Sequence, residues 1–229
     1  MKALLLPIVL SCFLSPVFAT AEHDYKPGEY LLIEKGLSPD KQYGLYAGQA
    51  GETFHIFLFS VEGKNKKKIG PLTEIEFRLD SAPEAFHAEW SPDSKHVAVT
   101  YRGDRHLMVM VVYRIENQRA YHVEIPSLFD TALPKFDREH YEMTDTSRGD
   151  VGLKWKGAKQ FVLLETSHYW HVHKNPQKKM GKFGKVKSEG DAEDKSALGV
   201  EFSAEALCEL TENDGVKILE LKPGKFGEE

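Results

Sequence analysis

Short apolar runs separated by turn residues recur along most of this chain. The stretch Leu37–Val61 aligns without a gap on Trp90–Arg114. In each copy a Ser-Pro-Asp turn precedes an apolar run, a glycine-containing turn and a second, more apolar run. A constant offset over such a length indicates an internal repeat. A third, weaker copy begins at Trp155, which falls on Trp90, although Lys-Gly-Ala replaces Ser-Pro-Asp there.

The second run of each copy, Phe54–Val61 and Leu107–Tyr113, is apolar at successive positions and not only at alternate ones. A strand that is apolar on both sides is buried on both faces, as in stacked sheets. The later runs Ile75–Leu79 and Tyr121–Ile125 alternate, which predicts half-solvated outer strands. The lysine-rich stretch Lys64–Lys68 is expected to be a charged hairpin tip. The pattern therefore predicts an all-β fold of stacked antiparallel sheets.

The motif at Trp90–Asp93, followed by an apolar strand, resembles the blade repeat of bacterial β-propellers. Similar repeats occur in the periplasmic propeller of the Tol system and in the propeller domains of prolyl-oligopeptidase-type peptidases. The resemblance covers Leu37–Ile125 well and Trp155–His173 poorly. It implies an antiparallel meander of propeller-like blades with about three repeat units, whereas closed propellers have roughly four to eight blades. The usual motif has glycine after the aspartate, where this chain has Lys41 and Ser94.

The remainder of the chain extends this picture. Two further strands are expected around the turn Asn213–Gly215, where they would complete the third sheet. The segment Lys174–Ser196 is rich in lysine and glycine and is expected to be a mobile surface loop. Residues 22–229 are thus predicted to form a single propeller-like β domain.

Residues 1–19 have the pattern of a secretion signal. Lys2 supplies a positive charge, an apolar run follows, and small residues up to Ala19 offer a cleavage site, with a second choice after Ala21. The apolar run is shorter than the roughly 20 residues that span a membrane. We therefore expect a periplasmic or secreted protein without a transmembrane segment. Lipid attachment at Cys12 is a minor alternative.

Charge and cysteine content narrow the function classes. The formal net charge of −5 gives no global attraction toward nucleic acid, so no nucleic-acid partner is expected. Cys12 would leave with the signal, which makes Cys208 a lone cysteine, expected to be a small buried hydrophobe. The sequence contains no nucleophile elbow, paired-histidine zinc motif or phosphate-binding loop. No catalytic or cofactor-binding residue can be assigned.

One dense cluster of chemistry-bearing residues contains His168, His171 and His173. If the chain is extended there, His171 and His173 share a face and offer two ligands to a metal such as zinc, with a third needed from elsewhere. Glu165 would lie on that same face unless a turn near Ser167 breaks the register. The alternative is a solvent-facing aromatic hairpin that binds no metal, and we favour it.

These features favour an exported, soluble binding or scaffolding protein whose partner is an envelope protein or a small ligand. A metal-binding protein or hydrolase centred on His168–His173 is the alternative. The two Arg-Gly-Asp triplets, which begin at Arg102 and Arg148, are interpreted as turns and not as adhesion motifs. Nothing in the pattern predicts the oligomeric state.

Overall fold

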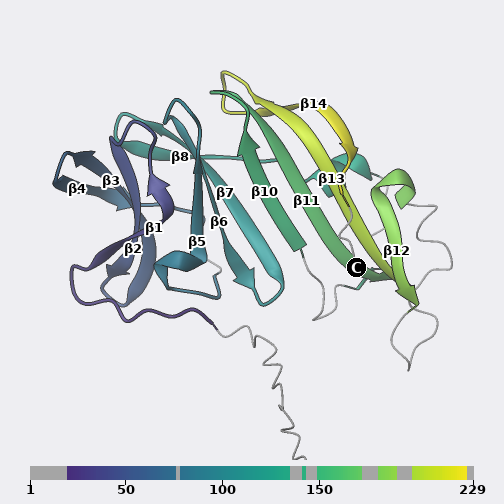
Figure 1. Ribbon diagram of the computed structural model, residues 1–229, viewed down its shortest axis with the longest axis horizontal. Coiled ribbons are helices and arrows are strands. Elements are labelled where there is room, and N and C mark those ends of the chain that lie inside the picture. Colours follow the sequence, from purple (N-terminus) through teal and green to yellow (C-terminus); the bar gives the residue numbers. More distant parts are fainter. Residues whose placement is uncertain are drawn as a thin grey trace, which may run out of the picture.

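A computed structural model describes residues 20–75, 78–134, 141–142, 149–171, 180–189 and 198–225 of the protein (Figure 1). Its strands form three blades of four antiparallel strands each. Blade 1 consists of β1 (Tyr30–Leu37), β2 (Tyr43–Ala50), β3 (Thr53–Glu62) and β4 (Asn65–Pro71). Blade 2 consists of β5 (Phe86–Trp90), β6 (His96–Asp104), β7 (Leu107–Glu116) and β8 (Arg119–Val123). Blade 3 consists of β10 (Gly149–Trp155), β11 (Gln160–His171), β13 (Leu198–Leu210) and β14 (Val216–Pro223).

The remaining elements are short. Strand β9 (Tyr141–Glu142) pairs with β11, and β12 (Gly184–Glu189) pairs with β13. The helical segments are α1 (Leu128–Ala132), η1 (Pro83–Ala85) and η3 (Gly181–Phe183). None of the helices in the described ranges has the length and hydropathy needed to cross a membrane.

Pairing is extensive within each blade and minimal between blades. The parallel pairing of β1 with β5 is a single residue pair, Glu34 with His87, and that of β10 with β7 is Gly149 with Leu107. Among the described strands no pairing joins blade 3 back to blade 1, so the mixed sheet is open. The blades follow one another across Figure 1 from blade 1 on the left to blade 3 on the right. The predicted all-β fold of propeller-like blades is confirmed.

Blade 2 is buried on both faces, as its continuously apolar strand predicts. Val111 and Tyr113 of β7 belong to the core that blade 2 shares with blade 1. Val112, whose side chain points the other way, belongs to the core shared with blade 3. Because successive residues of a strand face opposite sides, one apolar run supplies both cores.

The two repeat tryptophans join each blade to the one before it. Trp90 and Trp155 are both only 8% exposed. The indole Nε1 of Trp90 donates to the carbonyl oxygen of Gly36 in blade 1 at 3.2 Å, and Nε1 of Trp155 donates to that of Glu89 in blade 2 at 2.9 Å. Gly36 and Glu89 occupy the same place in their repeat copies, directly before the Ser-Pro-Asp turn region. The sequence repeat is therefore also a repeat of contacts between blades.

The outer strand of blade 1 differs from the expectation. The described residues of Ile75–Leu79 do not form a strand. Of the lysine-rich stretch predicted as a hairpin tip, Lys64 lies in the β3–β4 turn as expected, whereas Lys66–Lys68 belong to β4. The ammonium of Lys66 lies 4.5 Å from the ring centroid of Tyr46, and that of Lys68 lies 5.1 Å from the ring of Tyr30. Cation–π attraction lets a basic strand cover an aromatic face, which a pattern that counts lysine only as polar does not detect.

The predicted loop Lys174–Ser196 also needs correction in its described part. Residues 180–189 contain η3 and β12, and β12 pairs in antiparallel register with β13. The side chains of Met180 and Phe183 are buried in the core of blade 3 and fix this segment. The sequence pattern did not predict this segment because Met180 and Phe183 are isolated apolar residues in a stretch rich in lysine and glycine. The rest of the predicted loop lies outside the described residues.

Candidate functional site

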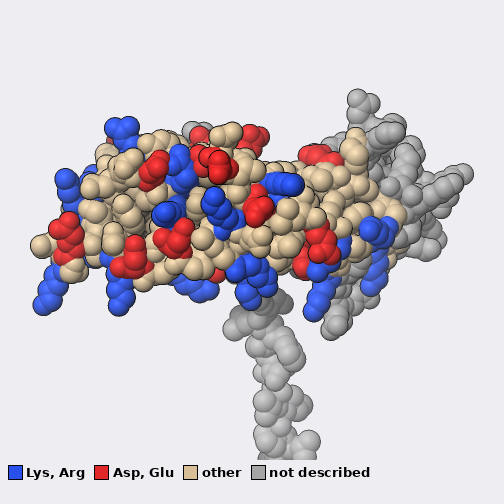
Figure 2. All heavy atoms as spheres, turned by 90° about the horizontal axis from the view of Figure 1, so that it is seen from above, with Lys and Arg blue, Asp and Glu red and all other residues tan. Residues whose placement is uncertain are grey.

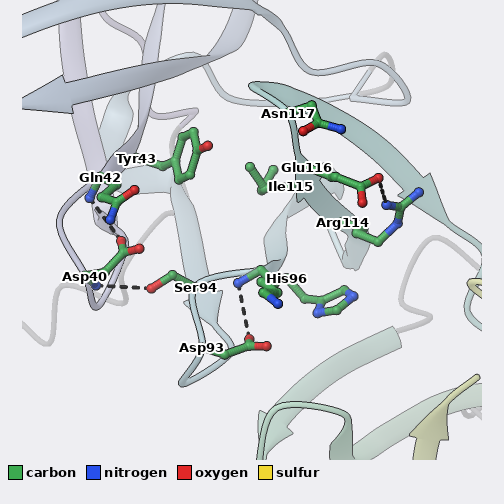
Figure 3. Close-up of a pocket in the computed structure, with 11 residues that line it drawn as sticks. Asp40, Gln42, Tyr43, Asp93, Ser94, His96, Arg114, Ile115, Glu116 and Asn117 are labelled. Atoms are coloured by element: carbon green, nitrogen blue, oxygen red, sulfur yellow. Dashed lines mark hydrogen bonds and ion pairs between the residues drawn. The ribbon is translucent and has the colours of Figure 1, made fainter. Parts of the chain in front are cut away.

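A pocket of about 360 Å³ opens between blades 1 and 2, where their Ser-Pro-Asp turns lie (Figure 3). The turns after β1 and β5 and the end of β7 with its following turn form its walls. The lining residues are Asp40, Gln42, Tyr43, Asp93, Ser94, Lys95, His96, Arg114, Ile115, Glu116 and Asn117. Sequence reasoning found both turns but not the pocket between them.

The two Ser-Pro-Asp turns have the same internal hydrogen bonds. In the first, Oδ1 of Asp40 accepts from the hydroxyl of Ser38 at 2.7 Å and from the backbone N–H of Gln42 at 3.0 Å. In the second, Oδ1 of Asp93 accepts from the hydroxyl of Ser91 at 2.6 Å and from the backbone N–H of Lys95 at 3.2 Å. These bonds explain why serine and aspartate recur at these positions.

A hydrogen bond also links one turn to the other. The backbone N–H of Asp40 donates to Oγ of Ser94 at 3.1 Å, across the boundary between blades 1 and 2 (Figure 3). The hydrogen bonds to its carboxylate outweigh the effect of burial and hold the pKa of Asp40 below its usual value. The pocket wall at this point is therefore an ionised carboxylate on a turn anchored to the neighbouring blade.

Both turns contain a residue in the left-handed region where the related motif has glycine. Lys41 and Ser94 each have φ of 61°. A side chain in this conformation costs roughly 1–2 kcal/mol. The two strained residues occupy equivalent positions in the repeat, and both are next to the pocket or line it.

Lys41→Gly should stabilise the protein by up to about 1 kcal/mol, because relief of the left-handed strain exceeds the extra entropy of glycine in the unfolded chain. Urea unfolding followed by circular dichroism measures the change. Lys41→Ala is the matched control, since it removes the same charge and keeps the strained Cβ, and it should give no such gain. Equal stability of the two variants would contradict the assignment of strain to this residue.

The Arg114 guanidinium at the pocket is paired with two carboxylates. Nε of Arg114 lies 2.8 Å from a carboxylate oxygen of Asp214, in the β13–β14 turn of blade 3, and its guanidinium also pairs with Glu116. These hydrogen bonds, that of Glu116 foremost, raise the pKa of Arg114. The guanidinium therefore connects blade 2 to blade 3 and presents a paired charge to the pocket.

His96 is the titratable residue that the sequence did not single out. It is 9% exposed, and its ring centroid lies 5.8 Å from that of Trp155. Its Nδ1 is buried and has no hydrogen-bond partner among the described residues. Burial is the main cause that lowers the pKa of His96, so the ring is neutral near physiological pH.

The pocket groups differ in charge and burial. The pocket offers an ionised carboxylate at the first turn, a paired guanidinium and a buried neutral imidazole. Side chains such as Gln42 and Asn117 can donate and accept hydrogen bonds at the rim.

The predicted histidine cluster is only partly described. β11 pairs with β13 without a register shift from Gln160 to His171, so no turn occurs near Ser167. The backbones of His168 and His171 therefore lie in one continuous strand. No group of three or more metal-ligating side chains occurs in the described ranges. His173 lies outside them, so the three-histidine metal site stays a prediction.

Glu165, the further ligand considered for that site, has a structural partner. Its carboxylate accepts the backbone N–H of Leu128 at 2.6 Å, at the start of α1. Ser127 caps the same helix by accepting the N–H of Asp130 at 3.2 Å. Burial raises the pKa of Glu165, although the hydrogen bonds that its carboxylate accepts from the start of α1 act in the opposite direction. The carboxylate thus holds α1 against blade 3.

Cys208 is buried in the core of blade 3 and is free. Burial raises the pKa of its thiol to about 11, so the reactive thiolate is scarce at neutral pH. The expectation of a small buried hydrophobe at this position is confirmed.

No protein-family model matches the chain, and no curated protein sequence does. Among solved structures, the chain is similar to a protein provisionally identified as TolB from Agrobacterium tumefaciens, with 10% identity and a TM-score of 0.30. The similarity covers 87% of this chain and 51% of that protein, so the chain spans about half its length. The blade architecture rests on the strand pairing described above and not on this likeness.

Proposed function

We propose that the protein is an exported binding or scaffolding module that recognises an envelope protein or a small polar ligand in the pocket between blades 1 and 2. The observation that carries this proposal is the hydrogen bond between Asp40 and Ser94, which locks two turns from different blades into one pocket wall. Loops held by a rigid sheet are well suited to recognition, because little conformational freedom is lost on binding.

The pocket chemistry favours a polar partner. Its walls alternate carboxylate, amide, hydroxyl and guanidinium groups, and Tyr43 and Ile115 supply apolar surface. An extended peptide segment with both donors and acceptors matches such a lining, because backbone groups can pair with the rim amides while one side chain occupies the pocket.

The test is affinity capture from envelope extract, with mass-spectrometric identification of the captured protein or ligand. Gln42→Arg places a larger, charged side chain at the pocket, and Gln160→Arg makes the same change on exposed β11 in blade 3. A partner of the pocket should be enriched by the wild type and by Gln160→Arg and depleted about tenfold with Gln42→Arg, which corresponds to about 1.4 kcal/mol. Capture that is unaffected by Gln42→Arg, or absent from all three samples, would overturn the proposal.

Export leads to a prediction about the first residue of the mature protein. The backbone N–H of Ala21 donates to Oδ1 of Asp80 at 2.7 Å, and its carbonyl oxygen accepts from Ser81 and Ala82 at 2.9 and 3.0 Å. Asp80 is 5% exposed and is also paired with Arg102. Cleavage after residue 19 keeps these contacts, whereas cleavage after Ala21 removes them.

We therefore expect the mature protein to begin at Thr20, as N-terminal sequencing of exported material would establish. Recombinant protein that begins at Glu22 should be less stable than protein that begins at Thr20 by roughly 1–3 kcal/mol, because a buried carboxylate loses a hydrogen bond. Equal denaturation midpoints for the two forms, or a mature start at Glu22, would contradict this expectation.

A further inference from the structure

The segment between β4 and β5 crosses from blade 1 to blade 2 and places Arg78 over an aromatic ring. The central carbon Cζ of its guanidinium lies 4.3 Å from the ring centroid of Phe54 in β3. The ring of Phe54 is itself stacked on that of Phe86 in β5, with the centroids 5.3 Å apart. The backbone N–H of Leu79 donates to the carbonyl oxygen of Arg102 in β6 at 2.9 Å. Contacts with both blades therefore hold Arg78 in its position.

Arg78 has no partner for its positive charge among the described residues. Three described arginines are partly buried, namely Arg78, Arg102 and Arg114. The guanidinium of Arg102 pairs with Asp80 at 2.6 Å, and that of Arg114 pairs with Asp214 at 2.8 Å. The guanidinium of Arg78 has its aromatic contact, but it forms no hydrogen bond or ion pair with the part of the chain that the structure describes. A charge that is withdrawn from water is costly unless an opposite charge or hydrogen bonds compensate for it.

The described carboxylate closest to Arg78 in sequence, that of Asp80, is already engaged. Its oxygens accept from Nη2 and Nε of Arg102 at 2.6 and 2.8 Å, and Oδ1 also accepts from the backbone N–H of Ala21 at 2.7 Å. On the face of the molecule shown in Figure 2, acidic and basic side chains are interspersed. The missing counter-charge of Arg78 is therefore a local feature and not a property of the whole surface.

The charge of Arg78 also affects a neighbouring titratable side chain. Burial is the main cause that lowers the pKa of His55, and the positive charge of Arg78 lowers it further. Burial also lowers the pKa of Arg78 itself, although the nearby phenol of Tyr101 acts in the opposite direction. Both basic groups therefore lie in surroundings that disfavour positive charge, and a bound anion would favour it.

We propose that Arg78 anchors a binding site for an oxyanion, namely the carboxylate or phosphate group of a ligand. A guanidinium has several N–H donors in a planar fork that matches both groups, and one aromatic contact cannot occupy all of them. The same contact orients the guanidinium before the anion arrives, which reduces the entropy lost on binding. This site is separate from the pocket at the Ser-Pro-Asp turns, because Phe54 pairs with Gln49 near the end of β2, whereas Tyr43, which lines the pocket, begins β2.

Nuclear magnetic resonance of the His55 imidazole tests the site, with inorganic phosphate and acetate as the probes. Each anion replaces chloride at constant ionic strength, and the variant His55→Gln identifies the resonances of His55. A bound anion offsets the charge of Arg78, so the pKa of His55 should rise, and the rise should saturate at roughly millimolar concentration, as for a weak ligand at a single site. The anion that half-saturates the site at the lower concentration identifies the ligand group as phosphate or carboxylate.

Substitutions of Arg78 separate the effect of its charge from that of its shape. Arg78→Met keeps an apolar cover on Phe54 and removes the charge, so the pKa of His55 should be raised without any anion, and phosphate or acetate should raise it no further. Arg78→Lys keeps the charge and loses the planar fork, so it should bind the preferred anion about tenfold more weakly. Arg119→Met removes an exposed arginine on β8 and is the matched control, which should bind like the wild type.

Circular dichroism establishes that every variant is folded. Gln42→Arg should respond to the anions like the wild type, which separates this test from that of the binding pocket. The proposal is overturned if neither anion gives a saturable rise in the wild type, if the response survives in Arg78→Met, or if Arg78→Lys binds as tightly as the wild type. Loss of the response in Arg119→Met would also overturn it, because the effect would then depend on the overall charge and not on Arg78.

Discussion

Trp90→Ala and Trp155→Ala should each lower the free energy of unfolding by about 3–5 kcal/mol. Both indoles are 8% exposed and pack in different cores, Trp90 between blades 1 and 2 and Trp155 between blades 2 and 3. Truncation leaves a cavity at the blade boundary and removes the N–H that pairs with a backbone carbonyl. The two losses should be similar, because the two positions are equivalent in the repeat.

Urea unfolding followed by circular dichroism measures both effects, and phenylalanine variants separate their causes. Trp90→Phe and Trp155→Phe keep most of the apolar area and lose only the indole N–H, so each should cost about 1–3 kcal/mol. If the alanine variants melt like the wild type, these tryptophans are not structural. If the phenylalanine variants equal the alanine variants, the hydrogen bond and not the packing dominates.

Val111→Asp should lower the free energy of unfolding by several kcal/mol and prevent folding in a chain of ordinary stability. Val111 is 6% exposed and lies in β7, in the core shared by blades 1 and 2. The neighbouring side chains there are apolar or aromatic, such as Ile115 and Val99, so the new carboxylate would be buried among apolar groups.

Lys182→Asp is the control, because it introduces the same side chain at an exposed position in η3. Its stability should stay within about 0.5 kcal/mol of the wild type. Thermal unfolding of the two variants gives the comparison, and equal melting temperatures would reject the burial of the face of β7 that points toward blade 1.

The sequence was sufficient for the repeat and for the features that depend on local pattern. The Ser-Pro-Asp turns follow from side chains that bond their own backbone, and the burial of β7 follows from an uninterrupted apolar run. The strands around Asn213–Gly215 were also predictable, because a glycine-containing turn separates two apolar runs. In each case the neighbours that decide the structure are close in sequence.

The remaining features depend on contacts between distant segments. The pocket exists because the turns at Asp40 and Asp93 meet across two blades, and no local pattern reports that approach. The lysines of β4 became part of a strand because aromatic rings of other strands lie beneath them. The strand that contains His168 runs on through the expected turn, because its long partner β13 pairs with it along its whole length.

The near absence of pairing between blades has a consequence for how the chain folds. Each blade of a single copy touches only its neighbours, so its stability is approximately a sum of blade terms and boundary terms. Blade 2 takes part in both boundaries, and the end blades take part in one each. Amide protons of β6 and β7 should therefore exchange most slowly with solvent, and opening should begin at the outer blades, where β4 and β14 can detach while the central blade keeps its structure.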